Sequence, residues 1–124
     1  MKQKENLDRL NQIKELKDNW NGYGVQSIDR IVIKSVENII KNVHIQPEIY
    51  PTGHNSIQLQ YELEDRSYLE FEVFKDKILC MKVPQRNYNK PEYEIIQPVD
   101  IKRINEIIDN FYIKTGEATD DNTI

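Results

Sequence analysis

The sequence is poor in the residues that build disulfide scaffolds and metal centres. Its 124 residues include one cysteine, Cys80, and two histidines. A single cysteine excludes an internal disulfide, and so few thiols and imidazoles exclude most zinc sites, which need a full set of Cys and His ligands. We therefore expect no metal, no cofactor and no thiol-dependent active centre.

Long apolar runs are missing as well. No stretch approaches the ~18 uninterrupted apolar residues of a membrane span, and the first residues lack the apolar run of a signal peptide. The length suits one hydrophobic core. We therefore expect a cytoplasmic protein that contacts no membrane, with a single domain over residues 1–115. The polar, acidic residues 116–124 predict a disordered tail.

Basic residues are fewer than acidic residues, and the difference varies along the chain. The chain has 17 Lys and Arg against 21 Asp and Glu, a net charge of −4. Residues 1–44 hold 8 basic and 6 acidic side chains, residues 45–96 hold 6 and 9, and residues 97–124 hold 3 and 6. Tight nonspecific nucleic-acid binding needs many cations, so this balance disfavours it. An acidic surface favours approach to a basic partner instead.

Three segments repeat apolar residues at the helical spacing of three and four. Ser27 is expected to cap the second helix, which runs to Val43, and Pro98 is expected to open the third. Asn21-Gly22 ends the first helix, and residues 19–24 form a tight connector that carries Trp20 and Tyr23. The apolar stripe of the first helix comprises Leu7, Leu10, Ile13, Leu16 and Trp20.

Between the second and third helices the period changes to two, which is typical of half-exposed antiparallel strands. The expected strands cover residues 57–64, 69–73, 78–83 and, more weakly, 93–96, with a short leading strand at residues 48–50. The order of two N-terminal helices, an antiparallel meander of about four strands and one C-terminal helix is α+β.

Pairing of these strands can be predicted one step further. If Leu63 lies opposite Leu69, residues 65–67 form the loop and Glu62 lies opposite Glu70, where like charges repel. A further loop at residues 75–77 would place Lys82 opposite Glu70 and Cys80 opposite Glu72. Lys82, a metal ion or a basic partner could then relieve the repulsion.

The outer face of this sheet is the first candidate site. Glu62, Glu64, Glu70 and Glu72 could meet Lys or Arg side chains of a basic protein, with Phe74 as an apolar anchor. The alternative is an ordinary solvated face, which many antiparallel sheets have. Catalysis by paired carboxylates needs a cleft with unequal environments, so we expect no enzyme here.

The loop at residues 85–91 is the second candidate site. Arg86, Tyr88 and Lys90 could stack on and hydrogen-bond unpaired RNA bases. A plain loop or a general protein contact is the alternative, because one short loop makes few phosphate contacts.

His54 is the basis of a third hypothesis, a hydrolase. It lies in the run Thr52-Gly53-His54-Asn55-Ser56, whose composition is also that of an ordinary turn. Neighbours within one turn seldom have the geometry of a catalytic triad.

Several motifs resemble those of a group of small, uncharacterised bacterial and phage-borne proteins. The run Trp-Asn-Gly-Tyr-Gly at residues 20–24 ends a leading helix. Pro51-Thr52 then leads a strand that contains residues 56–62, and a further motif covers residues 69–73. The resemblance spans residues 7–83 and implies a fold and a mobile-element origin. Small acidic proteins of such origin are similar, by analogy, to anti-defence inhibitors, including anti-CRISPR proteins.

These observations favour a non-catalytic protein-binding module. It would inhibit or regulate a larger bacterial protein, such as a ribonucleoprotein or nuclease with a basic nucleic-acid channel. The alternative is an RNA-contacting regulator that uses the loop of Arg86, Tyr88 and Lys90.

Overall fold

The computed structural model describes residues 2–22, 24 and 26–114. Along the chain, two helices precede a run of strands and one helix follows it. Tyr23 of the predicted connector and the predicted tail at residues 116–124 lie outside the described residues. The α+β class is confirmed, with five strands rather than about four, because the short leading segment is a full member of the sheet. The elements are α1 (Lys2–Lys14), α2 (Arg30–Asn42), β1 (Glu48–Pro51), β2 (Ile57–Glu62), β3 (Tyr68–Val73), β4 (Ile78–Val83), the short 3-10 turn η1 (Pro84–Arg86), β5 (Glu92–Ile96) and α3 (Ile101–Lys114).

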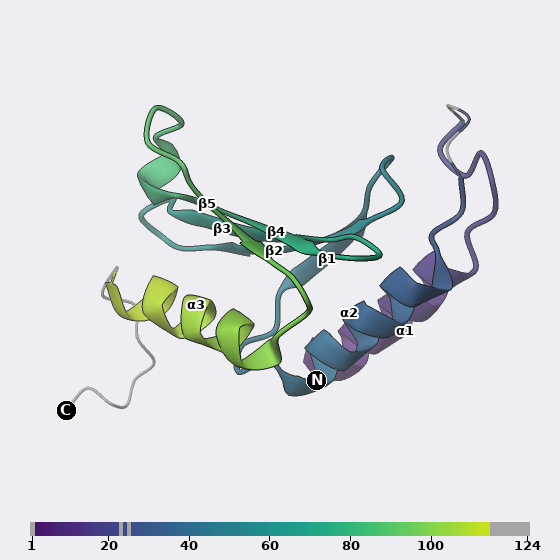
Figure 1. Ribbon diagram of the computed structural model, residues 1–124, viewed down its shortest axis with the longest axis horizontal. Coiled ribbons are helices and arrows are strands. Elements are labelled where there is room, and N and C mark those ends of the chain that lie inside the picture. Colours follow the sequence, from purple (N-terminus) through teal and green to yellow (C-terminus); the bar gives the residue numbers. More distant parts are fainter. Residues whose placement is uncertain (1, 23, 25, 115–124) are drawn as a thin grey trace.

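The molecule has two layers (Figure 1). The five strands form one antiparallel sheet in the order β1-β2-β3-β4-β5. All three helices lie on the same side of it, with α1 and α2 side by side near β1 and α3 separate from them. Among the described residues, no helix is long and apolar enough to cross a membrane.

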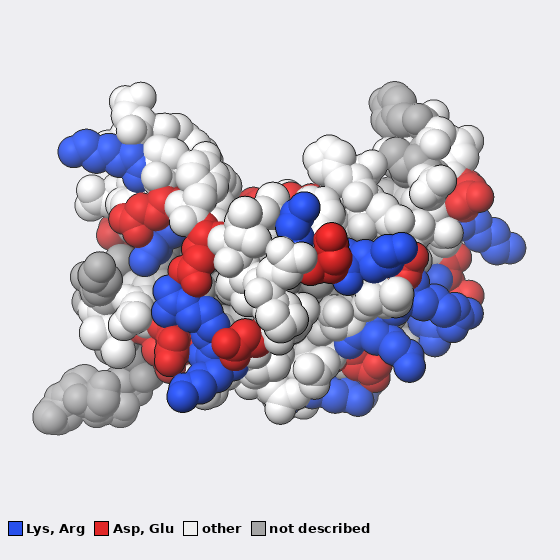
Figure 2. All heavy atoms as spheres, viewed as in Figure 1, with Lys and Arg blue, Asp and Glu red and all other residues white. Residues whose placement is uncertain are grey.

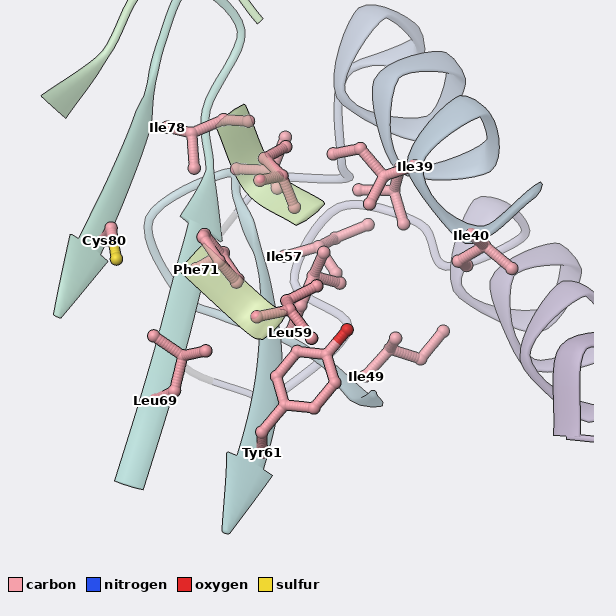
Figure 3. Packing of buried hydrophobic residues seen from close by; sticks show 14 of the residues in the cluster. Ile39, Ile40, Ile49, Ile57, Leu59, Tyr61, Leu69, Phe71, Ile78 and Cys80 are labelled. Atoms are coloured by element: carbon pink, nitrogen blue, oxygen red, sulfur yellow. The ribbon is translucent and has the colours of Figure 1, made fainter. Parts of the chain in front are cut away.

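The core lies between these two layers, and Figure 3 shows part of it. Its buried residues come from every helix and strand. Ile39 and Ile40 of α2 are fully buried, as are Ile57 and Phe71 of the sheet. The Tyr61 and Phe71 rings pack edge to face, with centroids 6.4 Å apart. Burial of each such side chain is worth ~1.5–3 kcal/mol, so the helix side of the sheet supplies most of the stability.

The first helix is shorter than predicted. It ends at Lys14, and the next turn tightens through a hydrogen bond from Leu16 N to Ile13 O of 3.1 Å. Trp20 therefore lies in the α1–α2 connector, where its Nε1 donates to Gln26 O at 3.1 Å. Its predicted place in the connector is confirmed, but the prediction that it continues the helical stripe was wrong. Asn19, just before it, has a positive φ of 64°, which an α-helix does not allow, although the spacing of Trp20 matches a helix.

The predicted starts of the other two helices were also wrong. Asp29, not Ser27, caps α2, and its Oδ1 accepts from Ile31 N at 2.8 Å. Ser27 N instead donates to the Asp18 carboxylate in the connector. The α3 helix begins after Asp100, which caps Arg103 N, so Pro98 precedes the helix rather than opening it.

The β2–β3 turn lies one residue earlier in the chain than predicted, so the loop covers residues 64–66 rather than 65–67. Leu63 N donates to Ser67 O at 3.0 Å, and Arg66 has a positive φ of 74° within the turn. Glu62 therefore lies opposite Tyr68. The predicted opposition of Glu62 and Glu70 was wrong, although both remain on the predicted face because the pairing shifts by an even number.

The β3–β4 turn changes the predicted strand pairing more, because its loop is two residues long rather than the predicted three. Phe74 N donates to Lys77 O at 2.9 Å. Glu70 lies opposite Met81, and Cys80 lies opposite Phe71. The predicted pairings of Lys82 with Glu70 and of Cys80 with Glu72 were wrong, because a shift of one residue turns every side chain of β4 to the other face.

Candidate functional site

The side of the sheet away from the helices is uncovered by any helix of the described residues (Figure 1). Figure 2 shows the upper outline dipping between two raised ends, and the arrangement in Figure 1 places the β4–β5 connection at one end and the β1–β2 loop at the other. We call this side the helix-free face. By register it carries Glu48, Tyr50, Gln58, Gln60, Glu62, Tyr68, Glu70, Glu72, Leu79, Met81, Val83, Tyr93 and Ile95.

The strands β1 to β3 supply the polar half of this face, and three predicted site residues lie there. Glu62 pairs with Arg86, with an O···N distance of 3.1 Å. Glu70 accepts from the Tyr68 hydroxyl at 2.8 Å. Glu72 accepts from the Ser56 hydroxyl, and its side chain is only 13% exposed. These carboxylates are therefore held in position by the protein, and Glu70 lies between the other two.

Glu64 and Phe74, the other predicted residues of the acidic face, lie at opposite ends of the β2–β3 pair. Glu64 is exposed in the β2–β3 turn. Phe74 is half-buried beside the β3–β4 turn, with Lys77 Nζ 5.4 Å from its ring centroid. Neither side chain therefore contributes to the centre of the helix-free face.

Arg86 joins the predicted basic loop to the sheet. Its guanidinium lies 4.2 Å from the Tyr68 ring centroid, donates to the Tyr88 hydroxyl at 2.9 Å and pairs with Glu62. Desolvation acts to lower the pKa of Arg86, but the hydrogen bonds with Tyr88 and Glu62 outweigh it and raise the pKa. Burial and the hydrogen bond to Glu70 raise the pKa of Tyr68.

The backbone of η1 is strained where it brings this side chain to the sheet. Gln85 and Arg86 have positive φ values of 50° and 59°, a conformation that costs a non-glycine residue roughly 1–2 kcal/mol. The amide of Gln85 donates to the Ser67 hydroxyl at 3.1 Å. Two of the three predicted loop residues, Arg86 and Tyr88, thus bind each other, while Lys90 is exposed near the loop tip.

The strands β4 and β5 supply an apolar half that the sequence did not predict. Leu79 lies opposite Ile95, and Met81 lies opposite Tyr93. The β4 run is mainly apolar on both faces, with Lys82 as its one charged residue, so periodicity could not show which residues point away from the helices. The one available signal was the alternation of polar and apolar residues from Glu92 to Ile96. It would have indicated the apolar surface only if β5 had been recognised as an exposed strand.

His54 lies in a hydrogen-bonded cluster at one end of this face. Its Nδ1 is 3.4 Å from Glu72 Oε2, and its amide donates to the Thr52 hydroxyl at 3.0 Å. The Ser56 hydroxyl bonds the Glu72 carboxylate rather than the imidazole. A nucleophile and base of the triad type need a hydrogen bond between hydroxyl and imidazole, so this arrangement ties the β1–β2 loop to β3.

A pocket of about 370 Å³ lies on the other side of the sheet, where Lys82, Glu92 and Phe111 are among its lining residues. Lys82 Nζ is 3.6 Å from Glu92. In the adjoining region Arg103 of α3 donates to both carboxylate oxygens of Glu94, at 2.8 and 2.7 Å. These hydrogen bonds lower the pKa of Glu94. Lys82 and Glu92 are thus paired with each other, as are Arg103 and Glu94.

Within the described part of the chain, no three His, Cys, Asp or Glu side chains are grouped so that they could hold a metal ion. Cys80 is buried on the helix side of β4.

Comparison of the chain with models of protein families, with curated proteins and with solved structures found no match. The resemblance to small phage-borne proteins therefore stays a prediction.

Proposed function

We propose that this protein is a non-catalytic binding module whose helix-free face docks onto a larger bacterial protein. The observation that carries the proposal is the composition of that face, where ordered carboxylates adjoin exposed apolar side chains. Interfaces commonly combine an apolar centre that supplies affinity with charged residues that supply specificity and orientation. The hollow between the two raised ends gives a partner a defined place to dock.

The partner is a protein with a basic surface, such as the nucleic-acid channel of a nuclease or ribonucleoprotein. Glu70 and Glu72 would face its Lys or Arg side chains, and Tyr93 and Ile95 would contact its apolar rim. Docking there would keep nucleic acid out of the channel, so the module would act as an inhibitor or regulator. Anti-defence proteins would act in this way by analogy.

Arg86 supports this proposal over RNA binding. Its guanidinium is already paired with Glu62 and Tyr88 and stacked on Tyr68. A phosphate would have to compete with these contacts, and Lys90 alone supplies little counterion release.

Charge reversal at the centre of the polar half tests the proposal. The bait protein carries Glu70→Lys, and the matched control carries Glu15→Lys, an exposed position just after α1 on the helix side. Both variants change the net charge equally. Proteins captured from bacterial lysate are quantified after the fold of each variant is checked by circular dichroism.

We expect Glu70→Lys to reduce capture of nucleic-acid-handling proteins at least ~10-fold, because like charges across an interface are costly. Glu15→Lys should leave their capture unchanged. Equal capture by the two folded variants would contradict the proposal.

A further inference from the structure

A groove of about 250 Å³ lies where α1 and the α1–α2 connector meet the end of β1. The described residues that line it are Arg9, Gln12, Ile13, Leu16, Trp20 and Pro51. Most of these side chains are apolar or aromatic, Gln12 is neutral, and Arg9 carries the only charge in the set. The groove therefore combines apolar surface and an indole ring with a single cation.

The Arg9 guanidinium is held in place by two contacts with β1. Its Nε donates to Ile49 O at 2.7 Å, and its Cζ lies 5.3 Å from the centroid of the Tyr50 ring. A guanidinium that lies over an aromatic ring keeps its edge free to donate hydrogen bonds in its own plane. Because the side chain is already ordered, it loses less conformational freedom when an acceptor binds there.

Arg9 has no carboxylate partner among the described residues. Its acidic neighbour in the sequence, Asp8, pairs with Lys4 at 3.0 Å, and none of the ion pairs in the described part of the chain includes Arg9. Neither of its Nη groups donates to an acceptor within that part. A guanidinium fits a carboxylate through two parallel N–H···O bonds. Charge complementarity therefore selects an anionic ligand for the groove.

Trp20 gives the groove a fixed aromatic wall. Its Nε1 donates to Gln26 O at 3.1 Å, so the polar atom of the indole is satisfied within the connector. The Oδ1 of Asn19 accepts from Gly24 N at 2.6 Å and closes the turn that carries Trp20. The ring is half-buried, and its carbon atoms present apolar surface to the groove. Aromatic rings pack well against such a surface, offset or edge to face.

We propose that this groove binds a small aromatic carboxylate, with the carboxylate held by Arg9 and the ring packed against Trp20. Pockets for drug-sized ligands usually measure ~300–1,000 Å³, so a single ring system with a short acidic side chain suits this smaller groove. One guanidinium matches a monoanionic carboxylate, whereas a phosphate monoester carries about two negative charges near neutral pH. A nucleotide is therefore the poorer occupant. Of the residues named for this site, only Tyr50 also belongs to the helix-free face, and the inference does not rest on the proposed function.

The indole N–H resonance of Trp20 reports directly on the groove, because the chain has one tryptophan. Indole-3-acetate is titrated into the full ¹⁵N-labelled chain while this resonance and the backbone amide resonances are followed. Three control ligands separate the contributions to binding. Indole-3-ethanol keeps the ring without the charge, acetate keeps the carboxylate without the ring, and AMP combines a ring with a phosphate.

We expect indole-3-acetate to shift the Trp20 indole resonance and the amide resonances of residues 9–20 in a saturable way, with a Kd below ~1 mM. Indole-3-ethanol should bind at least ~10-fold more weakly, because it cannot pair with the guanidinium. Acetate should also bind at least ~10-fold more weakly, because it buries no ring. We expect AMP to bind at least ~3-fold more weakly than indole-3-acetate, because one cation leaves part of the phosphate charge unbalanced.

Two variants that each remove one positive charge test the role of Arg9. Arg9→Gln keeps a side-chain donor but loses the cation, and we expect it to weaken indole-3-acetate at least ~10-fold. Lys102→Gln is the matched control, because Lys102 is exposed on α3, which lies apart from α1 (Figure 1). It should leave the affinity unchanged. Trp20→Leu, followed through the amide resonances, should weaken binding at least ~5-fold because it removes the ring. Circular dichroism checks the fold of each variant.

Several results would overturn the inference. Equal affinity for indole-3-acetate and indole-3-ethanol would show that the groove recognises no anion. Tighter binding of AMP than of indole-3-acetate would assign the groove to a nucleotide instead of a carboxylate. Equal effects of Arg9→Gln and Lys102→Gln, shifts confined to residues outside the groove, or no saturable shift up to ~10 mM ligand would also contradict it. None of these results alters the comparison of Glu70→Lys with Glu15→Lys, which tests the proposed function separately.

Discussion

Cys80 shows how strongly its surroundings control a single side chain. It lies opposite Phe71 in the core and is 5% exposed. Burial is the main cause that raises the pKa of its thiol to about 12, and the charge of Glu94 adds to this. Only the thiolate is nucleophilic. At pH 8 the folded protein therefore holds the Cys80 side chain almost entirely as the unreactive thiol.

We therefore expect Cys80 to be inert towards a thiol reagent such as DTNB at pH 8 while the protein is folded. The same reagent should label the chain completely in guanidinium chloride. Labelling of the native protein should proceed no faster than its opening, because the thiol must become accessible first. Complete labelling of folded protein within the mixing time would contradict this expectation.

At the scale of the element, one aspartate determines where α2 begins. Asp29 Oδ1 accepts from Ile31 N, and Asp29 N donates to Asn55 Oδ1 at 2.8 Å. The cap thus joins α2 to the β1–β2 loop as well as starting the helix. Ser27 also suits a cap by residue type, and the sequence could not distinguish the two because both precede the same apolar stripe.

We expect Asp29→Ala to lower the free energy of unfolding by about 1 kcal/mol, as loss of a side-chain cap usually does. Ser27→Ala is the matched control and should change it by less than ~0.5 kcal/mol. Urea unfolding followed by circular dichroism measures both. A larger loss in Ser27→Ala than in Asp29→Ala would show that the helix begins earlier.

The strands show a similar limit on prediction. Their positions follow from alternation in β2 and β3, where Gln and Glu separate the apolar residues. Cys80 and Lys82 in β4 were predicted on the wrong face. Both sets of alternate residues in β4 are mainly apolar, with Lys82 as the one charged member, so the length of one turn decides which set faces the helices. The apolar half of the candidate site was missed for that reason.

At the scale of the whole molecule, one core unites all the elements. Its buried cluster takes residues from each of the three helices and each of the five strands. Trp20 Nε1 donates to Gln26 O within the α1–α2 connector, and the hydrogen bond from Asp29 N to Asn55 Oδ1 ties the end of the connector to the β1–β2 loop. A domain of this size with one core usually unfolds in a single step.

We expect urea unfolding measured by Trp20 fluorescence and by far-UV circular dichroism to give the same midpoint. The slope should be about 1–3 kcal/mol per molar urea, as for other small domains. Trp20 reports on the connector and circular dichroism on the helices and sheet. A fluorescence transition at clearly lower urea would show that the connector opens separately from the core.

The sequence by itself determined the order of the elements, the α+β class and the side of β2 and β3 that carries the carboxylates. Those properties depend on the spacing of apolar residues along the chain, which can be read within each segment without knowing its partners in the fold. Tertiary structure alone decided the register of β4, the pairing of Arg86 with Glu62 and the exposure of Tyr93 and Ile95. Each depends on which segments, distant in sequence, contact one another in the fold. A long apolar run or a charged side chain is compatible with more than one such contact, so the sequence leaves the choice open.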